Sequence, residues 1–523
     1  MIRIVISLLL SLLAVPAGAA EALDYSPVVG KHYPTRVFWG DTHLHTNNSA
    51  DAYTFANTTL TAEQAYRFAR GEEIQSRFGL PVQLRDALDF LVVADHAEFL
   101  GVFRLLDAED PAFLATRLGK YWHEEIGKGN RGVVLRDFVA ALRGNPWDYA
   151  VEDKTYVSVW DEVTRLADQY YEPGRFTTYA TLRSRWEPLL EVTQMKGDSE
   201  SHPLLSPTDE FADFETWDRR NIDGSADKES WMLQYEYARS ALKLGLEYQQ
   251  DLGVNPFRFG LIGSTDSHTS LATADEDNFY GKFPTERPMP ERATASNEPF
   301  YENWQLGASG YAAVWAEENT RESLFAAMQR REVYATTGPR MVLRFFAGWH
   351  YLPDEIYSPD FVATGYRQGV AMGGELSQAP AGQALCFMVA VARDPRGANL
   401  DRVQIIKGWL NDEGMAEEKI FNVAVAGADR IDAKDGRVAP IRNTVIVSEA
   451  TYSNSVGAAE LMAWWQDPEF DASRPAFYYA RVLEIPTPRW TAYDAKYFGL
   501  SLPAEIPTWQ QERAYSSPIW YTP

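Results

Sequence analysis

The chain has 523 residues and a formal net charge of −24, with 45% hydrophobic and 13% aromatic residues. This composition excludes a disordered protein, and the length suits one large domain plus a smaller one. The negative charge argues against nucleic acid as a partner, because a phosphate backbone requires a basic surface. A single cysteine, Cys386, excludes an intramolecular disulfide and a cysteine-based metal cluster.

Residues 1–20 have the pattern of a secretory signal peptide. Arg3 is followed by an apolar run from Ile4 to Val15 and by the small residues Ala17-Gly18-Ala19. The apolar run is too short to span a bilayer comfortably. We therefore expect a periplasmic or secreted protein whose mature form is not inserted in a membrane.

The first predicted strand leads to two histidines. Val37, Phe38 and Trp39 are typical of a buried strand, and His43 and His45 follow it. Positions i and i+2 of an extended chain point to the same side, so both imidazoles can reach one point. Imidazole nitrogens are common ligands of divalent transition metals. Taken alone, the motif is short, and a chance pair of exposed loop histidines explains it equally well.

Two later strands end in the same residue types. Residues 88–94 form an apolar run that leads to His96, and residues 257–263 form another that leads to Asp266 and His268. Only eight histidines occur in the chain, and four of them follow these three strands. Active sites lie at the carboxyl ends of the strands in parallel barrels and sheets. The pattern therefore predicts that three strands contribute to one metal site.

Helical segments separate these strands. Thr61–Gln64 has the capping-box pattern and predicts a helix that ends near Gly71. Residues 100–172 are expected to be mostly helical, and an amphipathic helix is predicted from Trp231 to Leu246 with its apolar stripe in the core. Residues 270–310 lack such a pattern, and a loop this long beside a predicted site is often a lid.

The pattern changes near residue 341. The strand Val333–Thr336 leads to a turn with Arg340, which either clamps an anionic substrate or forms a buried salt bridge. Beyond it, short strands follow one another without intervening helices. This pattern predicts an antiparallel β subdomain over residues 341–523, packed on an α/β body formed by residues 21–340.

The motifs HxHT, ADH and DSH, each at a strand end and in this order, resemble those of the PHP (polymerase and histidinol phosphatase) metallohydrolase superfamily. The phrases FWGDTHLHT, FLVVADHAEFLG, EVTQMKGDSESHP, GLIGSTDSHT, EVYATTGPR and SSPIWYTP are similar to a secreted branch of it that is catalogued as a domain of unknown function. For residues 21–340 the resemblance implies a distorted (β/α)7 barrel with metal ions at its C-terminal mouth.

The resemblance also implies a set of site residues. Two groups of metal ligands are expected: His43, His45 and Asp266 for one ion, and Asp51, His96 and His268 for another. On the sequence alone, Asp51 is equally well explained as a turn cap. Glu98 is either an acid/base group or an ordinary loop carboxylate. Zinc, manganese or iron suits these ligands, with one or two ions bound.

The resemblance breaks down between residues 175 and 203. The family continues a stretch like Arg175–Tyr179 into a strand that ends in glutamate, followed by two histidine-bearing segments. Here the chain passes from Ala180 almost directly to Arg185, so the glutamate and both histidines are predicted to be deleted and the barrel to be incomplete. Glu200 and His202, after the next strand, are alternative pocket residues.

The expected function is hydrolysis of a small-molecule substrate by metal-activated water. A phosphoester is the first expectation, and an amide or carbamate ester is the second, because relatives of the superfamily branch that way. The predicted deletion leaves two other interpretations open. One is a degenerate exported protein that binds a metal or ligand without catalysis, and the other is an incomplete gene product. The sequence identifies neither the substrate nor the oligomeric state.

Overall fold

The computed structural model describes residues 33–130, 132–142, 153–180, 188–220, 226–297, 301–432 and 437–523. The predicted signal peptide and residues 181–187, where the deletion is predicted, lie outside the described residues. Among the described residues, no helix combines the length and the apolar character needed to cross a membrane.

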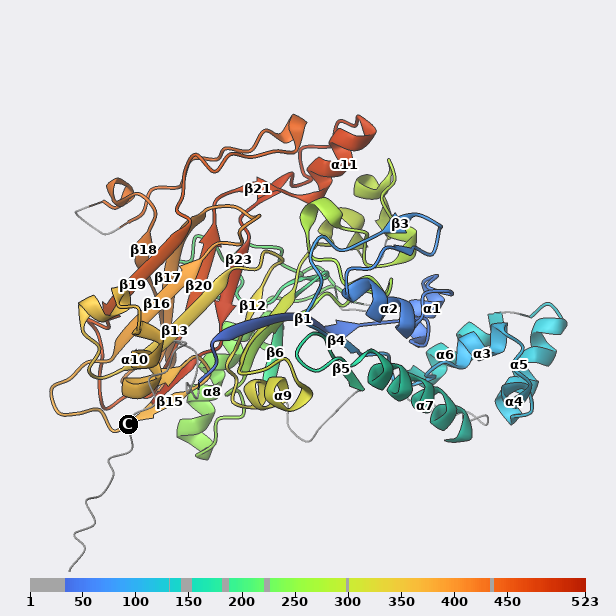
Figure 1. Cartoon of the computed structure of the whole chain (residues 1–523), viewed down its shortest axis with the longest axis horizontal. Coiled ribbons are helices and arrows are strands. Elements are labelled where there is room, and N and C mark those ends of the chain that lie inside the picture. Colours follow the sequence, from blue (N-terminus) through green and yellow to red (C-terminus); the bar gives the residue numbers. More distant parts are fainter. Residues whose placement is uncertain are drawn as a thin grey trace, which may run out of the picture.

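A mixed sheet of 11 strands runs through the molecule (Figure 1). Its main path is, in order, β15 (Glu375–Ser377), β24 (Ile519–Thr522), β20 (Ala476–Glu484), β23 (Arg513–Ser516), β12 (Val333–Thr336), β11 (Tyr311–Ala316), β1 (Arg36–Leu44), β4 (Phe90–Val93) and β5 (Thr177–Ala180). β17 (Leu400–Leu410) pairs with β20 and with β18 (Ala416–Val425). Strands β1, β4 and β5 are parallel, whereas β1, β11, β12 and β23 pair antiparallel.

Two smaller sheets complete the framework. β6 (Leu189–Gln194) pairs parallel with β8 (Gly260–Gly263) and antiparallel with β7 (Gly197–Asp198). A four-stranded antiparallel sheet contains, in order, β14 (Gly369–Ala371), β13 (Val342–Gly348), β16 (Cys386–Ala392) and β19 (Glu460–Gln466). The remaining short strands pair two by two: β2 (Ile74–Gln75) with β3 (Pro81–Val82), β9 (Ser296–Asn297) with β10 (Tyr301–Glu302), and β21 (Thr487–Pro488) with β22 (Trp509–Gln510).

The structure is a mixed α/β fold, and the closed barrel expected for residues 21–340 is not confirmed in the described part of the chain. There, β1, β4 and β5 belong to the large sheet, whereas β6 and β8 form a sheet of their own. β12 pairs with β23, which comes from the C-terminal part of the chain. The large sheet therefore continues through both halves of the sequence.

A glycine allows β8 to lie close to β11 and β12. A Cβ atom at Gly263 would lie 2.8 Å from the carbonyl oxygen of Tyr311 and 2.9 Å from that of Thr336. No other residue can tolerate such an approach of two backbones. This packing brings the residues after β8 to the end of β1.

Helices cover the sheets and extend beyond them. They are α1 (Ala50–Thr54), α2 (Ala62–Ala69), α3 (Val102–Asp107), α4 (Pro111–Leu114), α5 (Arg117–Gly127), α6 (Gly132–Leu142), α7 (Asp153–Tyr170), α8 (Ala238–Leu252), α9 (Arg321–Gln329), α10 (Phe361–Gln368) and α11 (Trp490–Phe498). Figure 1 shows α3 to α6 as a lobe at the end of the molecule beyond β4 and β5. The predicted capping box at Thr61–Gln64 is confirmed at the start of α2.

The predicted helix from Trp231 begins later than expected. α8 starts at Ala238, and the side chains of Trp231 and Tyr235 are 59% and 64% exposed. Only the later part of the predicted stripe is in the core, with Leu242 and Leu246 buried. The first two aromatic residues match the helical spacing, but the backbone is still extended at Tyr237, directly before α8.

A buried ionic cluster ties the segment after β7 to the C-terminal strands. Arg481 of β20 is fully buried and contacts both carboxylate oxygens of Asp209, at 2.9 and 2.7 Å, and Glu200 at 3.0 Å. Arg239 of α8 contacts Asp209 at 2.9 Å and Glu418 of β18 at 3.0 Å, and it also pairs with Glu200. Each charge has an opposite partner, as burial of charged groups requires.

Candidate metal centre

The end of β1 lies between β4 and residues 264–268, which follow β8. On one side β1 pairs in parallel with β4. On the other side, the amide of Asp266 donates to the His43 carbonyl at 2.8 Å, and the amide of His45 donates to the Ser267 carbonyl at 2.9 Å. Three strand ends that are far apart in sequence are therefore held side by side by backbone hydrogen bonds.

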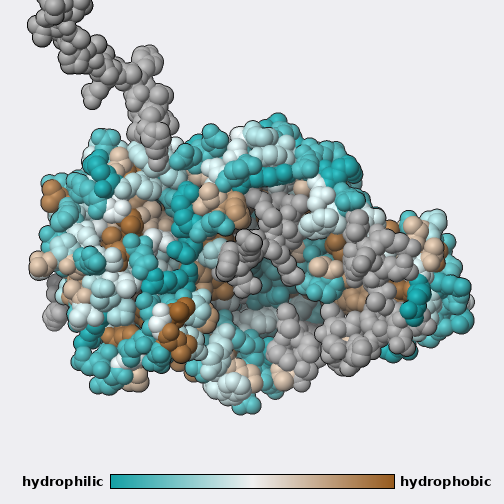
Figure 2. Space-filling view, turned by 90° about the horizontal axis from the view of Figure 1, so that it is seen from below, coloured by the Kyte–Doolittle hydropathy of each residue, from teal (hydrophilic) through white to brown (hydrophobic). Residues whose placement is uncertain are grey.

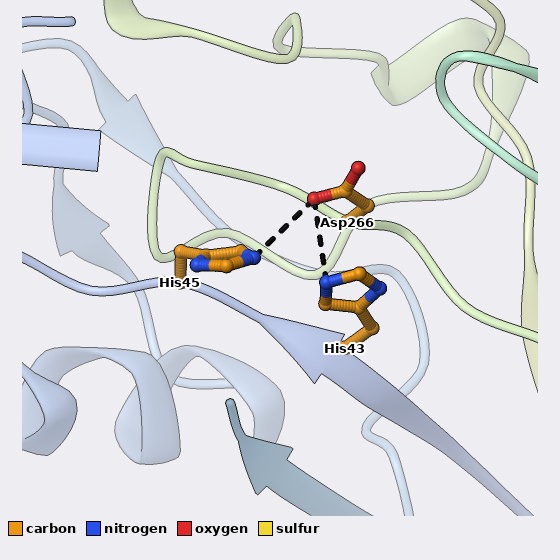
Figure 3. Close-up of side chains that lie close together, drawn as sticks. All are labelled: His43, His45 and Asp266. Carbon is orange, nitrogen blue, oxygen red and sulfur yellow. Dashed lines mark ion pairs between the residues drawn. The ribbon is translucent and has the colours of Figure 1, made fainter. Parts of the chain in front are cut away.

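The side chains of His43, His45 and Asp266 converge at this point (Figure 3). The Oδ1 atom of Asp266 lies 3.6 Å from Nε2 of His43 and 3.4 Å from Nε2 of His45. Ligands of a tetrahedral zinc ion at its usual bond lengths lie roughly 3.3–3.6 Å from one another. Asp266 has φ 53°, a left-handed conformation that is uncommon outside glycine and that recurs at functional sites.

The hydrogen bonds of Ser49 determine which nitrogen of His45 carries the proton. The Ser49 hydroxyl donates to Oδ1 of Asp51 at 2.6 Å and accepts from the amide of His96 at 3.2 Å. It lies 2.9 Å from Nδ1 of His45, which must therefore donate to it. In neutral His45 the lone pair of Nε2 then faces an oxygen of Asp266. Two acceptors that face each other in a buried site are favourable only with a cation between them.

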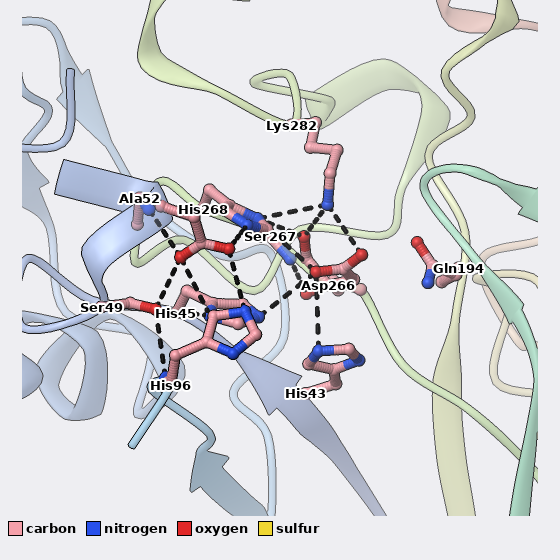
Figure 4. Close-up of polar contacts among 12 residues, drawn as sticks. His43, His45, Ser49, Ala52, His96, Gln194, Asp266, Ser267, His268 and Lys282 are labelled. Carbon is pink, nitrogen blue, oxygen red and sulfur yellow. Dashed lines mark hydrogen bonds and ion pairs between the residues drawn. The ribbon is translucent and has the colours of Figure 1, made fainter. Parts of the chain in front are cut away.

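The second group lies directly beside the first (Figure 4). Oδ2 of Asp51 is 2.7 Å from Nε2 of His268 and 3.1 Å from Nε2 of His96. The rings of His45 and His268 stack with centroids 4.2 Å apart. The second group whose ligand atoms are close enough to share one ion consists of His45, Asp51 and His96, so it contains His45 in place of the predicted His268 and shares His45 with the first group. The structure thus brings all six predicted ligands together.

Two lysines and a glutamate support the first group. Nζ of Lys196 and Nζ of Lys282 lie 2.7 and 2.8 Å from Oδ2 of Asp266, which leaves Oδ1 to face the histidines. Burial alone would raise the pKa of Asp266, but the two ammonium groups and His43 hold it well below its usual range. Glu191 of β6 lies 3.0 Å from Nδ1 of His43, as in the carboxylate–histidine pairs that orient metal ligands.

The two histidines at the end of β1, His43 and His45, differ in charge. Burial lowers the pKa of His45 to about 3, so its imidazole is neutral at pH 7. Burial also acts to lower the pKa of His43, but Asp266 and Glu191 outweigh it and raise this pKa to about 9. His43 therefore carries a proton in the metal-free protein, and metal binding at this point would displace that proton.

A cavity of about 700 Å³ opens over both groups. Besides the six predicted ligands it is lined by Ala50, Phe55, Glu98, Phe138, Lys196, Trp217, Lys282, Phe283, Thr285, Glu286, Ser296, Asn297 and Tyr301. Several of these residues belong to the predicted lid of residues 270–310. The face of the molecule shown in Figure 2 has a hydrophilic hollow near its middle.

The two predicted catalytic residues have different positions. Glu98 lines the cavity, its side chain is 59% exposed, and its carboxylate is 4.0 Å from Nδ1 of His96. Arg340 is not among the residues that line the cavity. Its guanidinium donates to the carbonyl oxygens of Ala87 and Asp86 at 3.0 and 2.9 Å and so holds a turn in place.

The alternative pocket residues after β6 are also outside the cavity. Glu200 belongs to the buried ionic cluster, and His202 lies 3.2 Å from Asp218. Lys196, which precedes them, does line the cavity. Its position could have indicated this, because it follows β6 as His96 follows β4. Lys282 and Glu191 have no comparable signal, since one lies in an irregular segment and the other within a strand.

Asp41 makes the stability of this region pH-dependent. Burial raises its pKa to about 7. Hydrogen bonds from the Thr265 hydroxyl and from the amides of His43 and Thr265 act in the opposite direction but do not outweigh burial. An unfolded aspartate titrates near pH 4, so between about pH 4 and 7 the unfolded state binds fewer protons than the folded state. The stability that protonated Asp41 contributes is therefore complete below about pH 4 and is lost as the pH rises to about 7.

Replacement of Asp41 by asparagine should remove this loss. Relative to the wild type, the free energy of unfolding of Asp41→Asn is expected to rise between pH 4.5 and 7, by up to about 1.4 kcal/mol per pH unit. Urea titrations of the metal-free proteins at several pH values measure the difference. Parallel pH profiles for the two proteins would contradict the assignment.

The fold and this cluster define a mixed α/β protein with a candidate metal centre at the ends of three strands. A family model described as "Protein of unknown function (DUF3604)" matches residues 32–181 and 178–523. The chain belongs to this DUF3604 family. No curated protein and no solved structure matches the chain. The two matched parts meet at residues 178–181, next to the predicted deletion.

Proposed function

We propose that the protein is a metal-dependent hydrolase of small molecules, with a phosphoester as the first expected substrate. One observation carries the proposal. The lone pair of His45 Nε2 faces Oδ1 of Asp266 at 3.4 Å, with Nε2 of His43 at 3.6 Å from the same oxygen. This arrangement of two imidazole nitrogens around one carboxylate oxygen fits a divalent cation that takes the place of the proton on His43. The resemblance of the motifs to the PHP superfamily supports the same reading.

The residues that would hold metal are the two groups described above, which share His45. A bound zinc, manganese or iron ion supplies Lewis acidity and lowers the pKa of water. The chain itself supplies positive charge, because Lys196 and Lys282 line the cavity beside Asp266. These ammonium groups can stabilise negative charge that develops on a phosphoryl oxygen. Glu98 lines the cavity and can act there as an acid/base group.

A second candidate is a binding protein without catalysis. The predicted loss of a glutamate and two histidines favours it, since a hydrolase of this kind would lack part of its metal ligands. The break in the family match near residues 178–181 is in agreement with that loss. An amide or carbamate ester remains the second choice of substrate for the hydrolase. We infer export to the periplasm or the medium from the signal-peptide pattern alone.

Metal analysis and turnover separate these candidates. The purified protein is stripped with a chelator, reloaded with zinc, manganese or iron, desalted and assayed on phosphoester, amide and carbamate panels. We expect at least about one equivalent of metal and turnover of a phosphoester that depends on it. Retention of less than roughly half an equivalent of every metal would refute a metal centre. Full retention without any turnover would favour the binding protein.

A further inference from the structure

The cavity has two chemically distinct parts. One is the polar floor formed by the candidate ligands together with Lys196 and Lys282. The other is a set of five aromatic side chains: Phe55, Phe138, Trp217, Phe283 and Tyr301. Polar groups that fix orientation beside an apolar wall are typical of a small-molecule site. The composition of each part therefore carries information about the molecule that fits.

The floor favours an anion. Two ammonium groups share the carboxylate of Asp266, and any bound metal adds further positive charge. The second carboxylate of the floor, Asp51, is already engaged by Nε2 of His268 and of His96, at 2.7 and 3.1 Å. The other acidic residues of the wall do not cancel this charge. Glu286 is 3% exposed and already accepts hydrogen bonds from the Phe283 amide and the Tyr301 hydroxyl. Glu98 is largely exposed to solvent.

The aromatic wall begins next to the metal ligands. The ring of Phe283 lies 4.9 Å from that of His268 and 4.6 Å from that of Phe55, centroid to centroid. Trp217 and Tyr301 form a second pair, with centroids 5.8 Å apart. The ring of Phe55 is 50% exposed although it belongs to the cavity. An aromatic group on a ligand could cover this ring and gain apolar contact area.

We propose that the site selects molecules with a phosphoryl or phosphonyl anion at one end and an aromatic ring at the other, so that the substrate is an arylalkyl or aryl phosphoester. The reaction rests on the proposed function, whereas the ligand class does not. In the hydrolysis, the oxygen of water bonds to phosphorus, the bond from phosphorus to the alcohol oxygen breaks, and that oxygen takes up a proton. The products are inorganic phosphate and the aromatic alcohol.

Two phosphonates test the ligand class without any chemistry. Benzylphosphonate and ethylphosphonate share the anionic group and differ in the ring. Titration calorimetry with the zinc-loaded protein is expected to give a dissociation constant at least about tenfold lower for benzylphosphonate, which corresponds to roughly 1.4 kcal/mol. Equal dissociation constants, or no binding of either compound, would overturn the proposal.

Two phenylalanines provide a matched comparison of variants. Phe55→Ala should raise the dissociation constant of benzylphosphonate close to that of ethylphosphonate, and it should leave ethylphosphonate within about twofold of the wild-type value. Phe78→Ala is the control, because Phe78 is 44% exposed and is not among the cavity residues. Lys196→Met should weaken both phosphonates alike. Equal effects of the two phenylalanine variants would contradict the role of the aromatic wall.

Hydrolysis of benzyl phosphate and ethyl phosphate separates this inference from the proposed function. If neither ester is hydrolysed but benzylphosphonate binds preferentially, the hydrolase proposal fails and the ligand class stands. If both esters are hydrolysed with the same KM and both phosphonates bind equally, the hydrolase stands and the ligand class fails. Hydrolysis with a lower KM for benzyl phosphate supports both.

Discussion

The His45→Ala variant is expected to lose at least about 100-fold in metal affinity, and any metal-dependent turnover is expected to fall with it. Mutation of a residue that only orients a metal ligand can lower metal affinity by about 100-fold. Removal of the ligand itself should therefore cost at least as much. His45 is the one residue that both candidate groups contain. Its loss removes a donor nitrogen that each group needs.

Metal content and thermal unfolding give two independent measurements of this effect. Zinc should raise the unfolding temperature of the wild type, because a ligand that binds only the folded state stabilises it by about 2.7 kcal/mol at 100 times its dissociation constant. His45→Ala should show little of this shift. His350→Ala, which changes an exposed histidine outside the cavity, should behave as the wild type. A full zinc shift in His45→Ala would remove the basis of the metal centre.

The Arg481→Ala variant is expected to lower the free energy of unfolding by about 3–5 kcal/mol. The substitution leaves Asp209 and Glu200 buried with only Arg239 as a cationic partner among the contacts described above. A buried carboxylate without a cationic partner destabilises the folded state by more than the intact ion pair stabilises it. Urea denaturation of the metal-free proteins measures the change.

An exposed ion pair supplies the comparison for Arg481. Lys419 and Glu469 form a pair in which both side chains are almost half exposed, at 45% and 46%. Lys419→Ala should therefore cost no more than about 1 kcal/mol. If Arg481→Ala is as mild as Lys419→Ala, the buried cluster does not hold the segment after β7 against the C-terminal strands. The position of Lys196, which precedes that segment, would then need another explanation.

The sequence predicts the convergence of the candidate metal-binding residues better than the arrangement of the strands around them. His43 lies at the end of a strand that begins with apolar residues, and His96 and Asp266 each follow a short apolar strand. Strand ends collect at one edge of a sheet whether or not the sheet closes. The local sequence pattern was therefore sufficient to predict that these residues lie close together. The partner of each strand is decided by contacts between distant segments, such as β12 with β23, and no local pattern contains that information.

The residues that complete the site show the same limit. Lys282 reaches Asp266 from an irregular segment, and Glu191 reaches His43 from within β6. Trp231 shows the opposite error, because helical spacing placed it in the core although it precedes α8 and is exposed. In all three cases, whether the side chain is buried, exposed or part of the site depends on tertiary contacts that the local sequence does not contain.

The pairing of Tyr334 with Ser516 in the middle of the large sheet has a consequence for how the molecule forms. Contacts between residues so distant along the chain carry a high loop-closure entropy and make folding slow. Until β23 arrives, β12 presents an unpaired edge that can recruit other chains. A ribosome-bound nascent chain that has emerged only as far as β12 would thus contain the candidate metal-binding residues but not the C-terminal strands that pack beside them, and would depend on chaperones to stay free of aggregates.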